Sequence, residues 1–260
     1  MKLHIDTIPV WDAIRQGGPC FLCTMRDRSE ATWAERFLGA SVMEPEWRIR
    51  VNRHGFCARH HQLLYGMGNR LGHALMLESH MHETTAAMNE ALSRAGRAAD
   101  AMGRGGLGRS KARQEEAYRA AVQDLGTMAE DCILCSHMAE DTANAVGTVL
   151  HLWQHDGEFR SVFAGCAGFC LPHLHALLAD APDLLPAKEL PGFIDALTRI
   201  EGPAYETMGS DVSWFIKKFD YRYQAEPWKN ARDAVPRAVN LLRGRTLPAD
   251  EAESSRDGGE

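Results

Sequence analysis

CFLC at residues 20–23 and GFCARH at residues 55–60 decide the fold, because both stretches return later in the chain. The second copies read CILC at residues 132–135 and GFCLPH at residues 168–173. The C-x-x-C copies lie 112 residues apart (132 − 20), and the G-F-C-x-x-H copies lie 113 apart (170 − 57). One unit of two motifs therefore occurs twice, which predicts duplication and two similar half-domains.

The residue types in each unit point to a metal. Zn²⁺ in structural sites takes four tetrahedral ligands, commonly three thiolates and one imidazole. A C-x-x-C turn can place two sulfurs on one ion, and a Cys and a His at i and i+3 share one face of a helix. We predict one zinc site within each repeat. The predicted ligands are Cys20, Cys23, Cys57 and His60 in the first site, and Cys132, Cys135, Cys170 and His173 in the second.

Two neighbouring residues compete with the predicted ligands. His61 is adjacent to His60, but the repeat selects His60 because its offset matches that of His173. Cys166 has no counterpart, since Arg53 occupies the equivalent position. We interpret Cys166 as a spare thiol that could substitute for a ligand.

Other interpretations of the cysteines stay open. Iron–sulfur clusters are the main alternative, although their usual spacings place three cysteines close together. A thiol-redox switch, in which oxidation changes the zinc–thiol site, is a second. Disulfides are disfavoured in a reducing compartment. Cysteines that are merely buried would have to explain the same spacing twice. Closed four-ligand sites leave no open position for substrate, which favours structural over catalytic metal.

The rest of the pattern is helical. Apolar residues recur at three-, four- and seven-residue steps between residues 77 and 95, and alternating β-branched runs are nearly absent. We therefore expect an all-α fold of two similar zinc-clipped helical half-domains with a C-terminal helical extension. The expected boundaries are 1–102 for the first repeat, 103–113 for a flexible glycine-rich linker, 114–200 for the second repeat, 201–246 for an aromatic helical segment and 247–260 for a disordered tail.

Residues 73–88, HALMLESHMHETTAAM, concentrate His73, His80 and His82 among methionines. A third, softer metal site here would make the chain a metal-handling protein. We favour an amphipathic helix with polar histidines on its wet face, because no ligand pair resembles a known signature.

The twin units, together with FIKKFDYRYQAEPW at residues 215–228, resemble a bacterial family known as domain of unknown function 6062. That family carries an Asp-Tyr-Arg signature after its second unit, matched here by Asp220, Tyr221 and Arg222. The resemblance covers about residues 5–244. It implies no activity, because the family is uncharacterised, and the His/Met-rich stretch departs from its pattern.

Charge, hydropathy and the absence of known catalytic motifs reduce the classes of function that we expect. A net charge of −6 argues against nucleic acid as a partner. The N-terminus lacks the apolar run of a signal peptide, and no window has the length of a membrane span, so we expect a cytoplasmic protein without membrane contact. No nucleophile elbow, phosphate loop or dinucleotide fingerprint occurs, which favours a non-enzymatic role. The leading hypothesis is a zinc-binding scaffold with an unidentified protein or small-molecule partner.

Overall fold

A computed structural model describes residues 3–104 and 109–247 of the chain. Within these ranges the protein contains eleven α-helices, one 3-10 helix and no strand, which confirms the all-α prediction. The elements are α1 (Leu3–Gln16), α2 (Phe21–Leu38), η1 (Ala40–Met43), α3 (Pro45–His54), α4 (Ala58–Gly66), α5 (Arg70–Gly103), α6 (Arg109–Glu130), α7 (Ile133–His155), α8 (Gly157–Ala164), α9 (Leu171–Leu184), α10 (Leu190–Lys217) and α11 (Ala234–Arg243).

Two expected segments fall partly outside the described residues. Of the predicted linker at 103–113, residues 105–108 are not described, and α6 already begins at Arg109, so 109–113 are helical. Strong helix formers in ARQEEAYRAAV extend the helix to that point. Of the predicted tail at 247–260, residues 248–260 lie outside the described part of the chain.

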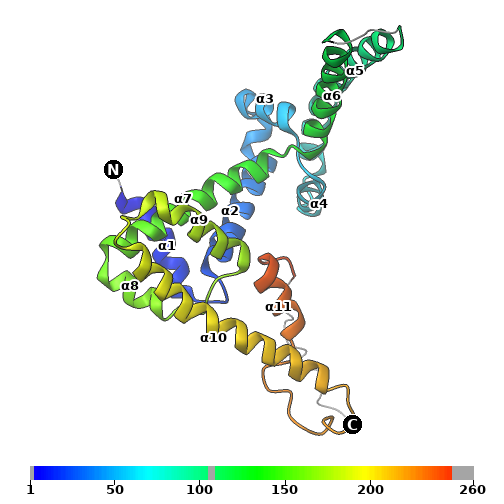
Figure 1. Ribbon diagram of the computed structural model, residues 1–260. Coiled ribbons are helices and arrows are strands. Elements are labelled where there is room, and N and C mark those ends of the chain that lie inside the picture. Colours follow the sequence, from blue (N-terminus) through cyan, green and yellow to red (C-terminus); the bar gives the residue numbers. More distant parts are fainter. Residues whose placement is uncertain (1–2, 105–108, 248–260) are drawn as a thin grey trace. The chain divides into compact units, whose positions relative to one another are not determined.

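Packing divides the chain into two compact units that do not follow the predicted repeats. The terminal unit comprises residues 1–28 and 141–260, and the central unit comprises residues 29–140. The boundaries fall inside α2 and α7 (Figure 1). This division differs from the expected one at 1–102 and 114–200, because each repeat contributes helical segments to both units.

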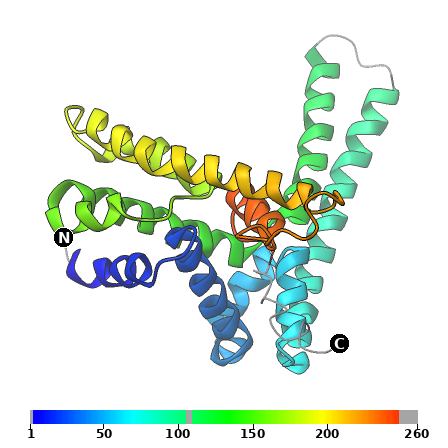
Figure 2. The same cartoon turned by 90° about the horizontal axis from the view of Figure 1, so that it is seen from below.

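The terminal unit is built around phenylalanines. Phe159, Phe163 and Phe193 are fully buried, and the ring centroids of Trp11 and Phe159 lie 5.3 Å apart in an edge-to-face contact. α8 begins where the carboxylate of its N-cap, Asp156, accepts a hydrogen bond from the N–H of Phe159. Figures 1 and 2 both show α11 lying against α10.

The central unit has its own core, in which Phe37, Val51, Phe56 and Leu64 are buried. His137 belongs to this core, because its ring stacks on Trp33 with centroids 3.9 Å apart. α5 and α6, of 34 and 22 residues, lie side by side as a helical hairpin (Figures 1 and 2). Among the described residues, no helix combines the length and apolar character of a membrane span.

Candidate metal centres

The eight predicted ligands converge in two groups of four, but the pairing between repeats is exchanged. In each group the four ligand atoms lie within 4.8 Å of one another. The terminal quartet joins the first C-x-x-C to the second G-F-C-x-x-H, and the central quartet joins the second C-x-x-C to the first G-F-C-x-x-H. The terminal quartet is Cys20, Cys23, Cys170 and His173, and the central quartet is Cys57, His60, Cys132 and Cys135.

The predicted pairing within each repeat is therefore wrong. Its physical reason lies in the helices that follow each C-x-x-C. α2 runs unbroken for 18 residues, which carries the chain about 27 Å at the rise of an α-helix. α7 runs for 23 residues, or about 35 Å. Each helix leads from the unit that contains its C-x-x-C into the other unit, which contains the second motif of the same repeat, so each quartet is completed by the other repeat.

Both G-F-C-x-x-H motifs take the local form that their sequence predicts. The glycines, Gly55 and Gly168, adopt φ of +60° and +117°, which side chains rarely tolerate. The cysteines, Cys57 and Cys170, occupy the N-cap positions of α4 and α9 without capping the helix through their side chains. Each sulfur therefore stays available at the N-terminus of its helix.

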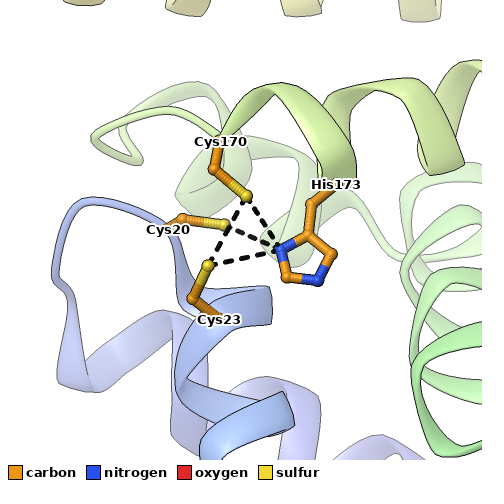
Figure 3. A group of neighbouring side chains, drawn as sticks. All are labelled: Cys20, Cys23, Cys170 and His173. Carbon is orange, nitrogen blue, oxygen red and sulfur yellow. Dashed lines mark hydrogen bonds between the residues drawn. The ribbon is translucent and has the colours of Figure 1, made fainter. Parts of the chain in front are cut away.

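The terminal quartet matches the dimensions of a tetrahedral zinc site. Figure 3 shows the three sulfurs directed toward the Nδ1 atom of His173. The Sγ atoms of Cys20, Cys23 and Cys170 lie 3.4, 3.4 and 3.2 Å from that nitrogen. The sulfurs of Cys23 and Cys170 lie 3.5 Å apart. Zinc–ligand bonds at tetrahedral angles place sulfurs about 3.8 Å apart, and sulfur and nitrogen about 3.6 Å apart, so the four atoms fit one ion.

Two thiols of the terminal quartet have pKa shifts in opposite directions. Hydrogen bonds to Cys170 and Cys23, together with burial, raise the pKa of Cys20 well above the ordinary range of a thiol. Hydrogen bonds to Cys170 and Cys20 lower the pKa of Cys23 far below that range. Burial would lower the pKa of His173, but hydrogen bonds to Cys170 and Cys23 raise it to about 9. A positive charge is therefore favoured among these four atoms, and a bound metal ion would supply it.

The C-terminal segment covers the terminal quartet. After α11, the backbone N–H of Arg245 donates a hydrogen bond to the sulfur of Cys23. The Arg245 carbonyl accepts one from the Arg26 guanidinium at 2.6 Å, and the Arg245 guanidinium pairs with Asp27 at 2.9 Å. All four members of the quartet are buried, at 1 to 5% exposure. The cover therefore shields the site from solvent.

A buried carboxylate on α10 supports the same quartet. Glu201 Oε1 accepts a hydrogen bond from the N–H of Phe169 at 2.8 Å, directly before the ligand Cys170. Burial raises the pKa of Glu201 to about 7. Within the described residues, its second oxygen has no hydrogen-bond partner. Nothing in the motif spacing points to Glu201, because it lies in the C-terminal extension.

The central quartet has similar dimensions. Its three sulfurs lie 3.2 to 3.4 Å from the Nδ1 atom of His60, and those of Cys57 and Cys135 lie 3.8 Å apart. The backbone N–H of Cys135 donates a hydrogen bond to the sulfur of Cys132 at 3.4 Å. These four atoms also fit one tetrahedral zinc ion.

A carboxylate orients the histidine of the central quartet. The Nε2 atom of His60 lies 3.0 Å from an Oε1 atom of Glu30, so that Nδ1 is left to face the sulfurs. Glu30 also pairs with Arg59 at 2.8 Å. Burial lowers the pKa of His60, although Glu30 opposes that shift. A metal-binding histidine commonly donates its other ring nitrogen to a carboxylate in this way, which fixes the ring and increases its basicity.

The central quartet is open to solvent. Cys135 is exposed and Cys57 is half-buried, whereas Cys132 and His60 are buried. Burial would raise the pKa of Cys57, but hydrogen bonds from the His60 backbone and neighbouring thiols lower it. Burial and the neighbouring Cys132 raise the pKa of Cys135 to about 12.

The remaining predicted candidates lie outside both quartets. His61 faces His73, with Nδ1 and Nε2 2.9 Å apart, and His80 bonds the carbonyl of Asn52 at 2.7 Å. His82 is exposed. In the described part of the chain, the two quartets are the only groups of three or more suitable side chains whose ligand atoms lie within 4.8 Å of one another, and these histidines belong to neither. Cys166 is no member of a quartet, and burial raises its pKa to about 11.

Comparison with known proteins identifies a family but no characterised relative. The sequence pattern of a family described as "Family of unknown function (DUF6062)" matches residues 1–249. No curated protein and no solved structure matches the chain. The match confirms the family resemblance that the sequence predicted.

Proposed function

Because the chain belongs to DUF6062, a family of unknown function, we propose a function from the two quartets: this is a zinc-binding scaffold protein with two structural Cys3His sites. The convergence of eight ligands from four sequence-distant segments carries the proposal. Three thiolates and one imidazole suit Zn²⁺, which is borderline soft and favours a tetrahedron. Bound zinc would supply the positive charge that stabilises the thiolates.

Zinc at these positions would stabilise the fold by closing long loops. The terminal quartet links Cys23 and Cys170, which are 147 residues apart. The central quartet links His60 and Cys132, which are 72 residues apart. Each closure restricts the unfolded chain, and a site assembled only on folding adds its binding free energy to stability.

The ligand count favours a structural role over catalysis. All four positions of each tetrahedron are filled by protein side chains, whereas catalytic zinc keeps one position for water or substrate. The described residues bring no further ligand group together that could provide an open site. We therefore propose that the protein functions by binding a protein or small-molecule partner. We also propose that it is located in the reducing cytoplasm, where its seven cysteines form no disulfides.

Thiol-redox regulation is a second candidate, favoured by the exposure of Cys135 and its 3.8 Å separation from Cys57. Peroxide could oxidise these two thiolates to a disulfide while it is reduced to water, and the central ion would be released. The terminal quartet, being buried, would keep its ion. This candidate therefore concerns the central quartet only.

Elemental analysis and thermal unfolding of natively purified protein test the proposal. We expect two zinc ions per chain, no visible absorption, and a large drop in melting temperature after chelation that zinc restores. Anaerobically purified protein that is brown would establish iron–sulfur clusters instead. A melting curve unchanged after verified metal removal would refute the structural role.

A further inference from the structure

The α5–α6 hairpin of the central unit exposes an apolar row. Large apolar side chains on its outer surface are between 39 and 64% exposed. They are Met81, Met88 and Leu92 on α5 and Tyr118 and Val122 on α6. The seam between the two helices is instead made of small residues, since Ala91, Ala98 and Ala121 are buried. The large side chains are therefore not needed to hold the hairpin together.

These side chains share one face of the hairpin. Each residue turns an α-helix by about 100°. Measured from the buried Ala91, Met88 and Leu92 lie about 60° and 100° to one side. Measured from the buried Ala121, Tyr118 and Val122 lie at the same two angles. Both rotations are measured along the chain, starting from the residue that faces the other helix. Because α5 and α6 are antiparallel, equal rotations of this kind reach the same face of the pair, so the two rows form one surface.

The opposite face of the hairpin is polar. Exposed polar residues lie on the opposite side of Ala91 and Ala121 from the apolar rows. They are Glu83, Glu90 and Arg97 on α5 and Arg113 and Thr127 on α6. The Arg94–Asp124 ion pair crosses the two helices on that side. The hairpin is thus amphipathic, with one face suited to water and one face suited to another apolar surface.

We propose that the apolar face of the hairpin binds the same face of a second copy of this chain, so that the two hairpins form a four-helix bundle. Two-layer helix packing is the usual way to cover such faces. The row from Met81 to Leu92 and the row from Tyr118 to Val122 contain no charged residue that faces the same way, so two copies meet without repulsion. A twofold axis through the face lets each copy contribute both rows.

The dimensions of the face fit a stable dimer. The part of the face without charged residues covers residues 81–100 of α5, about 30 Å, and residues 118–130 of α6, about 20 Å. Lys111 and Glu115 lie on the same side of α6 before this part. With each helix about 10 Å wide, each copy would bury about 500 Å² and the pair about 1,000 Å², which is the lower limit for a specific interface. Gly96 and Gly126, which border the face, have no atom within 4 Å of a notional Cβ, so a neighbouring helix can approach closely there.

Sedimentation equilibrium of the full-length, metal-loaded chain tests this proposal. We expect a dimer that dissociates with dilution. The double variant Leu92→Glu/Val122→Glu should raise the dimer dissociation constant by at least about 100-fold, because it places four charges in the apolar interface. The matched control is Ala86→Glu/Ala120→Glu, which adds the same charges to exposed positions of the polar face and should leave the constant unchanged.

Each outcome decides the proposal. Both replaced side chains are already about half exposed, so we expect wild-type helicity and two bound zinc ions in the double variant. If the double variant unfolds, Leu92→Gln/Val122→Gln, which adds no charge, should still weaken the dimer. A wild-type chain that is monomeric at all concentrations would overturn the proposal. A dimer that survives both face variants, or that the polar-face control weakens equally, would also overturn it.

Discussion

The two quartets have the same residue types, three cysteines and one histidine, but they differ in their exposure to solvent. The terminal quartet is buried at all four positions, whereas the central quartet exposes Cys135 and half-exposes Cys57. The difference arises from the C-terminal extension, which contributes Arg245 and Glu201 to the terminal unit alone. Duplicated motifs can thus give one protected and one accessible quartet, because the chain added outside the repeat covers only one of them.

The largest expected effect is a difference in the rate of metal loss. When a chromogenic chelator is added, the central quartet should lose its zinc at least about 100-fold faster than the terminal quartet. The chelator can reach the exposed sulfur directly, whereas a buried site must first open locally. Two well-separated kinetic phases of equal amplitude would support the comparison. Cys135→Ser should abolish the fast phase and keep the slow one. A single phase in the wild-type protein would contradict the assigned difference in access.

The next effect concerns the orientation of His60 by Glu30. Glu30→Gln removes the charged acceptor of the Nε2–H group, and we expect zinc affinity at the central quartet to fall by about 10- to 100-fold. Competition with a chelator of known affinity measures this loss. Glu35→Gln, an exposed glutamate on the same helix, should change neither site. An equal loss at the terminal quartet would show a general effect on folding instead.

The smallest effect concerns the cover over the terminal quartet. Gly244 adopts φ of +81°, and a Cβ there would lie 3.0 Å from the Arg26 guanidinium and 3.9 Å from the sulfur of Cys170. Gly244→Ala should therefore strain the turn into Arg245 and speed zinc loss from this quartet roughly tenfold. The slow phase of chelation reports it, and the fast phase serves as the internal control. An unaltered slow phase would mean that the segment does not protect the site.

The repeat predicted every member of the two quartets, including His60 rather than His61, because two copies of one spacing identify equivalent positions. It could not predict the pairing. Both arrangements use the same motifs, and the choice depends on how far α2 and α7 carry the chain, which requires the helix ends to be known. The all-α class followed from the apolar periodicity, whereas the unit boundaries inside two helices left no mark in composition.

The supporting residues carry weaker signals. Glu30 lies seven residues after Cys23 on the same helix, and a carboxylate two turns from a ligand is common without any function. Glu201 and Arg245 act on the terminal quartet from a separate part of the chain, so only tertiary structure reveals them. The burial of His137 in the core of the central unit is also visible only in the tertiary structure, because it depends on stacking with Trp33.

Zinc stoichiometry in two double variants tests the exchanged pairing most directly. Cys20→Ser/Cys170→Ser removes two ligands from one proposed site and should leave one zinc ion per chain after dialysis against a weak chelator. Cys20→Ser/Cys57→Ser removes one ligand from each proposed site and should leave essentially none. The reverse result, with zinc retained only in the Cys20/Cys57 variant, would show that each repeat closes its own site and would contradict the account.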